Sequence, residues 1–377
     1  MIRLTIPSID DAECQAATDV LQSGYLVQGP CVAEFEARLA ERVGTRHAVA
    51  VSSGTAALHI ALLALDIGPG HRVATTAYSW PATANVIELC GATPVFVDLD
   101  PTTGNMSPDA LSESLAQLER DGTHESLAAI LPVHLFGHMA DMPAILDIAT
   151  RHGVPVVEDA ACALGSCLAS QPAGSWGRIG CFSFHPRKAI TTGEGGVVTT
   201  DDDQLALTLK ALRNHGLDAG STSPDFIRPG FNYRLTDLQA AVGLAQLEKL
   251  DPVIEARRRA AAVYSRLLAD LPVTTPVVPA RSAPNWQSYV IRLPAGTDRS
   301  RLVQALRDRD IESTMGTWHI PRTTWFANRY GWNRGDFPVA DLLFDTELTI
   351  PLYEGITEKD QRSVADAIRD SLPVLSA

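Results

Sequence analysis

The sequence predicts an α/β fold whose large domain has a mainly parallel central sheet flanked by helices. Up to about residue 200, short and fully apolar runs typical of buried strands alternate with segments of helical periodicity. Helical periodicity dominates to about residue 270, and the remaining residues mix strand-like and helical runs. We therefore expect a large domain over residues 12–250 and a small C-terminal α+β domain over residues 251–377, to which residues 1–11 contribute.

The first predicted elements are a helix, a strand and a second helix. Residues 31–44 repeat apolar side chains three or four positions apart and end at Gly44, which is typical of an amphipathic helix with a glycine stop. The apolar run HAVAVSSG, residues 47–54, predicts a buried strand. The largely apolar residues 55–65 predict the helix that follows.

Further strands of the large domain are short apolar runs that end in turn residues. They occupy residues 71–80, 93–100, 128–137, 154–161, 181–185 and 196–200. Helical patterns fill residues 81–92 and 235–250. Because fully apolar strands must be covered on both faces, these runs predict helices on both sides of the sheet.

Two strand-like runs and two helical patterns make up the predicted small domain. The strands are expected over residues 288–293 and 347–352, and the helices over residues 297–310 and 357–372. Each helical pattern begins with a residue that can cap a helix N-terminus, Thr297 or Asp298 in the first and Thr357 in the second.

Composition narrows the class of protein. With 377 residues, of which 45% are hydrophobic and 20% charged, the chain is long enough for a sizeable core. A formal net charge of −13 and the lack of a basic block argue against a nucleic-acid partner or an acidic membrane surface. Without a secretory signal or an apolar stretch of about 18 residues, we expect a soluble protein and no membrane partner.

The six cysteines favour a reducing cytoplasm. They form no CxxC motif and have no zinc-ligand spacing with histidine, so the sequence predicts neither a metal site nor a disulfide framework.

Residues 50–58, AVSSGTAAL, place small residues between a predicted strand and a predicted helix. At such a junction the first backbone N–H groups of the helix and its positive end point at one spot, here beside the hydroxyls of Ser52 and Ser53. This arrangement predicts a phosphate-binding turn. The alternative is that Ser52, Ser53 and Gly54 only make a tight turn and a helix cap.

Glu158 and Asp159 lie near the end of the apolar run 154–161. Open α/β sheets bind their ligands at the carboxyl ends of the strands. A carboxylate buried there is costly unless a cation pairs with it, so Asp159 is a candidate for binding a positively charged group. A structural salt bridge at the strand end is the alternative.

Lys188 lies in the stretch FHPRKAITTGEGG, residues 184–196, just after the predicted strand that carries Ser183 and His185. The chain has only four lysines against 27 arginines, so an amine at this position suggests a chemical role. A lysine can lose its proton and attack a carbonyl, which an arginine cannot do. A surface lysine beside a flexible glycine-rich turn is the alternative.

A phosphate-binding turn, a carboxylate at a strand end and an amine nucleophile are the three contacts that pyridoxal 5′-phosphate (PLP) requires. Its aldehyde forms a Schiff base with lysine, its ring nitrogen pairs with a carboxylate, and its phosphate anchors it. Motifs of other sites are missing, since no GxGxxG follows a strand and GxxxxGK[ST], GxSxG and HExxH do not occur. We therefore predict PLP as the cofactor.

With these residues in place, the sequence closely resembles the DegT/StrS family of PLP-dependent sugar aminotransferases. The similarity covers nearly the whole chain, through SGYLVQGP, AVSSGTAALHIAL, VEDAACALGS, GCFSFHPRKAITTGEGG and GFNYRLTDLQAAVGLAQL in this order. It implies the fold type I PLP-dependent aminotransferase architecture. Lys188 also separates the chain from the family's sugar dehydratases, which have histidine at that position.

The resemblance implies roles for the matching residues. Lys188 would be the catalytic residue, forming the Schiff base and moving a proton between substrate and cofactor. Asp159 would pair with the ring nitrogen, and Trp80 of YSWPATANV would stack on the ring. The cofactor phosphate would be held by Gly54, Thr55 and Ser183.

Two further positions carry implications of their own. Asn232 of FNYR matches a residue that reaches the phosphate from the neighbouring subunit, which implies a homodimer with shared active sites; a satisfied asparagine at a helix entry is the alternative. Cys162 stands near the cofactor hydroxyl, where the family usually has Gln or His. Since a thiol is a poor hydrogen-bond partner, we expect cofactor tuning or substrate scope to differ from the typical member.

The implied reaction transfers an amino group from glutamate or glutamine to a keto-sugar, commonly nucleotide-linked, in glycan or secondary-metabolite (antibiotic) biosynthesis. His185, Tyr233, Arg234 and His319 are weaker candidates for contacts with the acceptor. One alternative is a cyclitol aminotransferase of aminoglycoside biosynthesis, acting on a scyllo-inosose-type substrate. Another is a non-catalytic, PLP-binding regulatory relative. A PLP lyase or desulfurase would need a reactive cysteine on a mobile loop, and Cys162 is not so placed.

Overall fold

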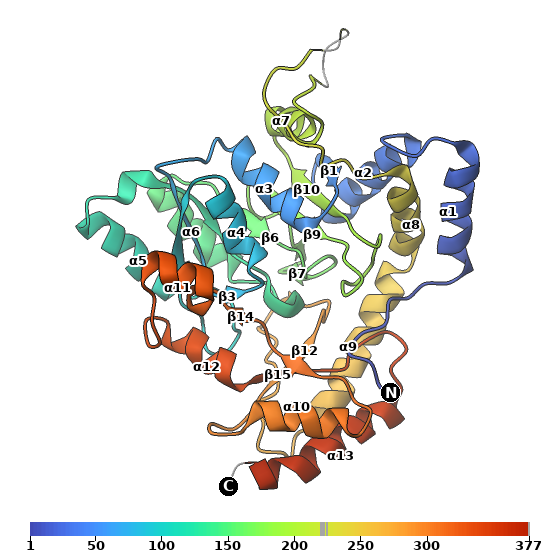
Figure 1. The fold of residues 1–377 in the computed structure, drawn as a ribbon, viewed down its shortest axis with the longest axis vertical. Helices are drawn as coiled ribbons and strands as arrows, with labels where there is room; N and C mark the ends of the chain where they lie inside the picture. The colour runs from blue at the N-terminus through green and yellow to red at the C-terminus, as the bar shows by residue number, and fades with distance from the viewer. Residues whose placement is uncertain (219–222, 224, 376–377) are drawn as a thin grey trace.

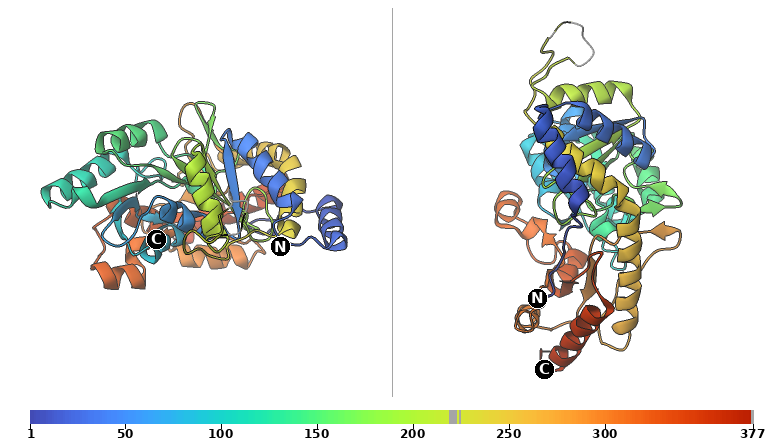
Figure 2. Two further views of the ribbon diagram at one scale, coloured as in Figure 1. Left: turned by 90° about the horizontal axis from the view of Figure 1, so that it is seen from above. Right: turned by 90° about the vertical axis from the view of Figure 1, so that its right-hand side faces the viewer.

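The computed structural model describes residues 1–218, 223 and 225–375. Its upper part is built around a central sheet, and its lower part contains α10 (Arg299–Arg307) and α13 (Glu358–Leu375), as Figure 1 shows. The long helix α9 (Leu250–Leu267) runs from the first part to the second (Figures 1 and 2). Within the described ranges, no helix is both long and apolar enough to cross a membrane.

In the described part of the chain, seven strands form the central sheet. Their order is β1 (His47–Val51), β10 (Gly196–Thr200), β9 (Ile179–Ser183), β6 (Val157–Asp159), β5 (Leu127–Leu131), β2 (Arg72–Thr76) and β4 (Thr93–Val97). Parallel bridges from Ile130 to Val156 and from Val133 to Asp159 join β5 to β6. The remaining neighbours pair in parallel except β10, which is antiparallel to both β1 and β9. The predicted mainly parallel sheet is confirmed, with one antiparallel strand that the sequence did not indicate.

Helices cover the sheet. They are α1 (Asp11–Ser23), α2 (Pro30–Val43), α3 (Gly54–Ala64), α4 (Ala82–Leu89), α5 (Pro108–Arg120), α6 (Met142–His152), α7 (Asp203–Arg213) and α8 (Asp237–Glu248). The four helices predicted for this part correspond to α2, α3, α4 and α8, and α7 lies in the stretch of predicted helical periodicity after residue 200. The sequence did not indicate α1, α5 and α6. Gly44 ends α2 as predicted, because it adopts φ 78° and donates its N–H to the carbonyl oxygen of Ala40.

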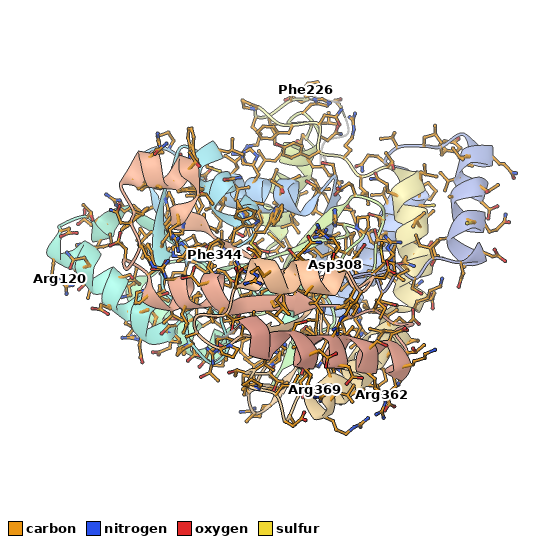
Figure 3. The ribbon with its side chains drawn as sticks, turned by 60° about the horizontal axis from the view of Figure 1, so that its bottom comes forward. Arg120, Phe226, Asp308, Phe344, Arg362 and Arg369 are labelled. Carbon is orange, nitrogen blue, oxygen red and sulfur yellow. The ribbon has the colours of Figure 1, made fainter. Side chains whose placement is uncertain are left out.

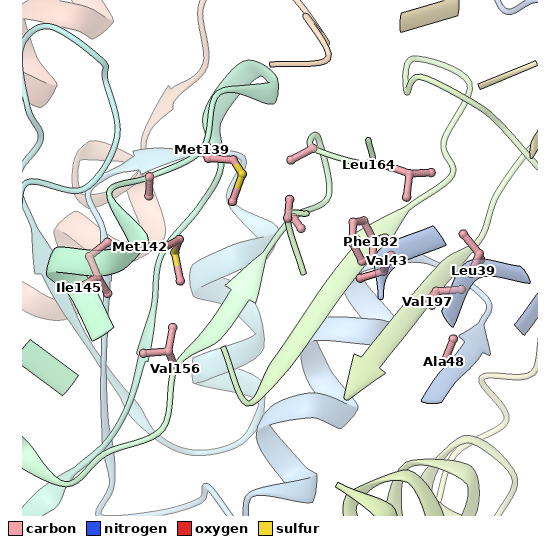
Figure 4. Packing of buried hydrophobic residues seen from close by; sticks show 14 of the residues in the cluster. Leu39, Val43, Ala48, Met139, Met142, Ile145, Val156, Leu164, Phe182 and Val197 are labelled. Carbon is pink, nitrogen blue, oxygen red and sulfur yellow. The ribbon is translucent and has the colours of Figure 1, made fainter. Parts of the chain in front are cut away.

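Neighbouring residues of the central strands face opposite sides of the sheet. Phe182 of β9 and Val197 of β10 pack with side chains of α2 in one apolar cluster (Figure 4). The adjacent Cys181 and Val198 belong to a second cluster, with side chains of α3 and α7. Both faces are therefore buried, which explains why apolar residues follow one another along these strands instead of alternating with polar ones.

The lower part contains the elements predicted for residues 251–377. Strands β12 (Tyr289–Arg292), β15 (Glu347–Ile350) and β13 (Thr314–Met315) form an antiparallel sheet beside α10 and α13. Asp298 caps α10, its carboxylate accepting from the backbone N–H of Arg301, and the hydroxyl of Thr357 accepts from the N–H of Asp360 at the start of α13. Ile2 bridges to Ile311, so the N-terminal residues do lie here (Figure 2). The domain boundary at 250/251 stays a prediction.

Part of the C-terminal sequence packs against the upper part instead. Strand β14 (Trp318–His319) pairs with β3 (Tyr78–Ser79). The segments that follow, η3 (Ile320–Arg322), α11 (Thr324–Tyr330) and α12 (Pro338–Thr346), bury apolar side chains together with Ala77, Phe96 and Val133. The short elements left to name are β7 (Cys167–Leu168), β8 (Gln171–Pro172), β11 (Ser282–Ala283), η1 (His124–Ser126) and η2 (Leu135–Gly137).

Candidate active site

The carboxyl ends of β1, β9 and β6 meet at one edge of the central sheet, and the predicted site residues lie there. Asp159 ends β6, Ser183 ends β9, and Gly54 begins α3 just after β1. Gly54 and Ser183 are in such close contact that a Cβ atom at Gly54 would lie 2.7 Å from the Ser183 Cβ. Three segments that are far apart in the sequence are therefore brought together.

Lys188 lies in the turn that follows β9. Its backbone N–H donates to the carbonyl oxygen of His185 at 2.8 Å, and its own carbonyl accepts from Arg257 Nη2 at 3.2 Å. The amine donates to Cys162 Sγ at 3.0 Å. Lys188, Cys162 and Ser183 line one small pocket. The amine is therefore half-buried and fixed at the sheet edge, which disfavours the alternative of a free surface lysine.

Asp159 is a buried carboxylate whose hydrogen-bond donors are neutral. It is 4% exposed, and its two oxygens accept from the Thr83 hydroxyl at 2.8 Å and from the Ala161 backbone N–H at 3.1 Å. Burial raises the pKa of Asp159, while the two hydrogen bonds and the nearby Lys188 charge act in the opposite direction. A carboxylate in this environment would be stabilised by a cationic partner.

Thr83 is a site residue that the sequence reasoning missed. It lies in the first turn of α4, where its hydroxyl contacts the Trp80 carbonyl at 3.2 Å as well as Asp159. The one sequence signal was its position three residues after Trp80, at the start of a helix. Trp80 itself is 65% exposed, so its indole surface is open to contact by another group.

The start of α3 has the features of an anion site. The Ser53 hydroxyl caps the helix by accepting from the Ala56 N–H at 3.1 Å. Helix geometry leaves the N–H groups of Gly54 and Thr55 without intrahelical acceptors, next to Ser183. The helix cap is confirmed for Ser53, and because the remaining donors stay available, phosphate binding at this turn stays a prediction.

Gly54→Ala is expected to weaken PLP binding about 10- to 100-fold, because the added methyl group overpacks the contact with Ser183 by an amount worth about 1–3 kcal/mol. Titration of PLP-free protein with PLP, followed by absorbance, measures the change. Gly355→Ala is the matched control, since a Cβ at Gly355 meets no atom within 4 Å. Equal affinities of the two variants would show that Gly54 does not border the phosphate.

Glu158 next to Asp159 has a structural function. It is fully buried, and its oxygens accept from His134 Nε2 and from the backbone N–H groups of Gly174, Trp176 and Gly177 at 2.7–2.8 Å. Because its carboxylate accepts four hydrogen bonds, three of them from backbone N–H groups of residues 174–177, Glu158 fixes the turn that leads into β9.

Glu158→Gln is expected to lower the free energy of unfolding by about 2–4 kcal/mol, because the new amide group would face N–H donors instead of accepting from them. Urea denaturation of the PLP-free protein measures this loss. Glu125→Gln, at an exposed position, should change stability by less than about 0.5 kcal/mol. A loss of that small size for Glu158→Gln as well would contradict the structural role.

Of the weaker acceptor candidates His185, Tyr233 and Arg234, one lies beside Lys188. His185 is half-buried beside Lys188, its Nδ1 accepts from the Arg187 N–H, and burial lowers its pKa. The Tyr233 hydroxyl contacts His59 of α3, and Arg234 donates to the Asn214 side chain at 2.7 Å. Within one chain, the described side-chain contacts of Tyr233 and Arg234 therefore lie beside α3 and the end of α7 rather than at Lys188. Their backbone pairs with Val51 and Ser52 at the end of β1.

His319 does not suit the contact expected of it. Its side chain is buried, with the residue 1% exposed, and it packs against Phe337 and Phe344 with Nε2 3.5 Å from Asp341. Burial lowers its pKa. The sequence could not show this, because the enclosing residues come from α12 and its N-terminal flank. A contact with the acceptor is not supported in this arrangement.

The donor set fits PLP. Among the described residues, Asp159 has no cationic hydrogen-bond partner, which suits a protonated ring nitrogen. A helix start with free N–H groups beside a serine suits a phosphate. An amine that lines the adjoining cavity suits an aldehyde. These three groups lie at one sheet edge, as a single ligand with those three functions requires.

Comparison with known proteins agrees with this chemistry. The sequence model of the DegT/DnrJ/EryC1/StrS aminotransferase family matches residues 7–369. The spore coat polysaccharide biosynthesis protein SpsC of Bacillus subtilis is 37% identical over 97% of the chain and 96% of its own length. GDP-perosamine synthase of Caulobacter vibrioides is 37% identical over 97% of each. The solved structure of Spr1654 from Streptococcus pneumoniae in its PLP-form superposes with a TM-score of 0.90 at 27% identity, over 99% of the chain and 98% of its own.

Proposed function

The chain belongs to the DegT/DnrJ/EryC1/StrS aminotransferase family and is a PLP-dependent aminotransferase, and from this premise we propose that it transfers an amino group from glutamate or glutamine to a nucleotide-linked keto-sugar. The observation that carries the proposal is the placement of the Lys188 amine, the buried Asp159 carboxylate and the open start of α3 at one sheet edge.

When bound, PLP supplies an aldehyde for the amine and a ring that withdraws electrons from the substrate. Asp159 would hold the proton of the ring nitrogen by hydrogen bonding, and Thr83 keeps that carboxylate oriented. Gly54, Thr55 and Ser183 would bind the phosphate. Trp80 would contact the ring with its indole, and Cys162 lies beside Lys188.

Lys188 moves the proton of both half-reactions. Its Nζ would take a proton from the α-carbon of the donor and deliver it to the cofactor, and it would move a proton in the reverse direction with the acceptor. The amine is held in reach by the turn at His185 and by the bond from Arg257 to its carbonyl oxygen. His185 is the remaining candidate for an acceptor contact close to Lys188.

We also propose a homodimer with shared active sites, in which Asn232 of the partner subunit approaches the phosphate. Asn232 is exposed, and the exposed apolar residues Tyr25 and Val27 lie beside the same stretch, since Val27 bridges to Thr236. Phe226 is exposed at the end of the molecule opposite α13 (Figure 3). Exposed apolar side chains of this size favour association when a partner covers them. Sedimentation equilibrium that shows only a monomer at micromolar concentration would overturn this assembly.

The location proposed for the reaction is the cytoplasm. The six cysteines, all free, support it.

Spectroscopy tests the first half of the reaction. PLP-loaded protein is expected to show a near-visible absorbance band that glutamate or glutamine bleaches, with release of the matching 2-oxo acid. No band after PLP addition would favour the non-catalytic alternative, and a band that neither donor changes would reopen the choice of donor.

An acceptor panel tests the second half. The amine-loaded enzyme is offered nucleotide-linked 4-keto-sugars and a scyllo-inosose-type cyclitol, and the aminated products are detected by mass spectrometry. Turnover of the nucleotide-linked sugars at least about tenfold faster supports the proposal, whereas the opposite preference establishes the cyclitol alternative.

A further inference from the structure

We propose that Cys162 and Lys188 form a modification site, in which hydrogen peroxide oxidises Cys162 while Lys188 is free of the cofactor, and Cys162 Sγ then bonds to Lys188 Nζ as a sulfenamide. This covalent switch goes beyond the proposed amino transfer, because it does not depend on which acceptor the enzyme uses.

The two reacting atoms are already in contact. Lys188 Nζ lies 3.0 Å from Cys162 Sγ, and both side chains line the same small pocket. Both residues are partly exposed, so hydrogen peroxide can approach them from solvent. Formation of the S–N bond then requires only side-chain adjustment.

The proximity is set by the backbone on both sides. Asn285, which is fully buried, donates from Nδ2 to the carbonyl oxygens of Cys162 at 3.0 Å and of Leu164 at 2.9 Å. Gln287 donates from Nε2 to the carbonyl oxygen of Arg187, the neighbour of Lys188. The segment before β12 thus holds the cysteine loop and the lysine loop against each other.

The other cysteines are less suited to the reaction. Thiols are oxidised through the thiolate, and burial raises the pKa of Cys31, Cys90, Cys167 and Cys181. Cys14 is exposed on α1, and within the described residues no lysine is hydrogen-bonded to its thiol. In the residues that the structure describes, the bond between Lys188 and Cys162 is the one hydrogen bond that joins a lysine to a thiol.

The chemistry balances in two steps. In the first, the Cys162 sulfur attacks a peroxide oxygen, so that an S–O bond forms, the O–O bond breaks and one water leaves with the thiol proton. In the second, the neutral Lys188 amine attacks the sulfur, so that the S–N bond forms, the S–O bond breaks and the departing hydroxide takes an amine proton as a second water. The sulfur is oxidised by two electrons, and the peroxide is reduced by two.

The bond removes the lysine from catalysis. With Nζ attached to sulfur, Lys188 can neither react with the PLP aldehyde nor accept a proton. Cofactor loading should protect the site, because it occupies the same nitrogen.

Tryptic mapping tests the bond. PLP-free protein treated with hydrogen peroxide is expected to yield the peptide 152–178, which contains Cys162, joined to the peptide 188–210, at a mass two hydrogen atoms below the sum of the two. Dithiothreitol should release both peptides and restore PLP loading. PLP-loaded protein and Cys162→Ser should give none of the joined product, and Cys14→Ser as much as the wild type.

Two outcomes would overturn the proposal. One is sulfenic or sulfinic acid at Cys162 without joined peptide, in protein that loads PLP normally before treatment. The other is joined peptide that forms equally in PLP-loaded protein. Failure to load PLP before treatment would count against the proposed function and not against this bond.

A second measurement tests the proximity without oxidation. o-Phthalaldehyde gives a fluorescent isoindole when a thiol and an amine react with it together. PLP-free wild type and Cys14→Ser should become fluorescent, whereas Cys162→Ser and Lys188→Arg should lose most of the signal. Lack of fluorescence in folded wild-type protein, as judged by circular dichroism, would show that the two groups are not within mutual reach.

Discussion

Lys188→Ala is expected to slow the conversion of glutamate to 2-oxoglutarate by at least about 10³-fold, because it removes both the nucleophile and the proton carrier. The near-visible band that depends on this lysine should be absent from the PLP-loaded variant. Stopped-flow absorbance after glutamate addition measures the rate. Stability should change little, since the Lys188 side chain is half-buried and, within the described part of the chain, forms one hydrogen bond, to a thiol.

Two further variants separate chemistry from charge. Lys188→Arg keeps a cation in the cavity but cannot be deprotonated, so we expect a loss as large as that of Lys188→Ala. Lys359→Ala, at an exposed position of α13, is the matched control and should retain full activity. If Lys188→Arg kept even a tenth of the wild-type rate, the lysine would act as a charge and the nucleophile would have to be sought elsewhere.

The sequence predicted which residues would meet at one sheet edge, because this depends only on the order and direction of the strands. Asp159, Ser183 and the start of α3 each lie at the end of a strand, and strands that run in one direction end at one edge of the sheet. The sheet edge was therefore predictable from the apolar runs. The same reasoning gave the glycine that ends α2 and the residues that cap α10 and α13.

What the sequence could not predict are contacts between distant segments. Thr83 reaches Asp159 across 76 residues, and Asn285 holds the Cys162 loop across 123 residues. The hydrophobic periodicity of the sequence does not indicate such pairs, because each depends on how helices and loops pack on the folded sheet. The burial of His319 has the same origin, since β14 pairs with β3 far back in the chain.

Asp159→Asn should show whether the buried carboxylate serves the cofactor or the fold. Its amide can still accept from the Thr83 hydroxyl, but it offers no negative charge to a protonated ring nitrogen. We expect the rate of amino transfer to fall by at least about 10²-fold, as when a single electrostatic contact to the reacting group is lost. Steady-state kinetics with glutamate measures the fall, and Asp109→Asn, at an exposed position, should leave the rate unchanged.

The folding stability of PLP-free Asp159→Asn should not fall with its rate. Burial raises the pKa of Asp159, so its carboxyl form is favoured in the folded PLP-free protein, and the stability present below the ordinary pKa of 3.8 is lost as the pH rises through the raised value. Asparagine has no charge to bury. The PLP-free variant should therefore be at least as stable as the wild type at pH 8, and this advantage should shrink as the pH falls toward 3.8.

Urea denaturation of PLP-free protein at several pH values decides between the two roles. An inactive variant with equal or greater stability means that Asp159 is kept for the cofactor, and that its burial is a cost which the bound ring offsets. An unstable variant at every pH would mean that the carboxylate supports the loop at Ala161 and the start of α4 instead. The rate loss would then reflect a damaged fold, and the assignment of Asp159 to the ring nitrogen would fail.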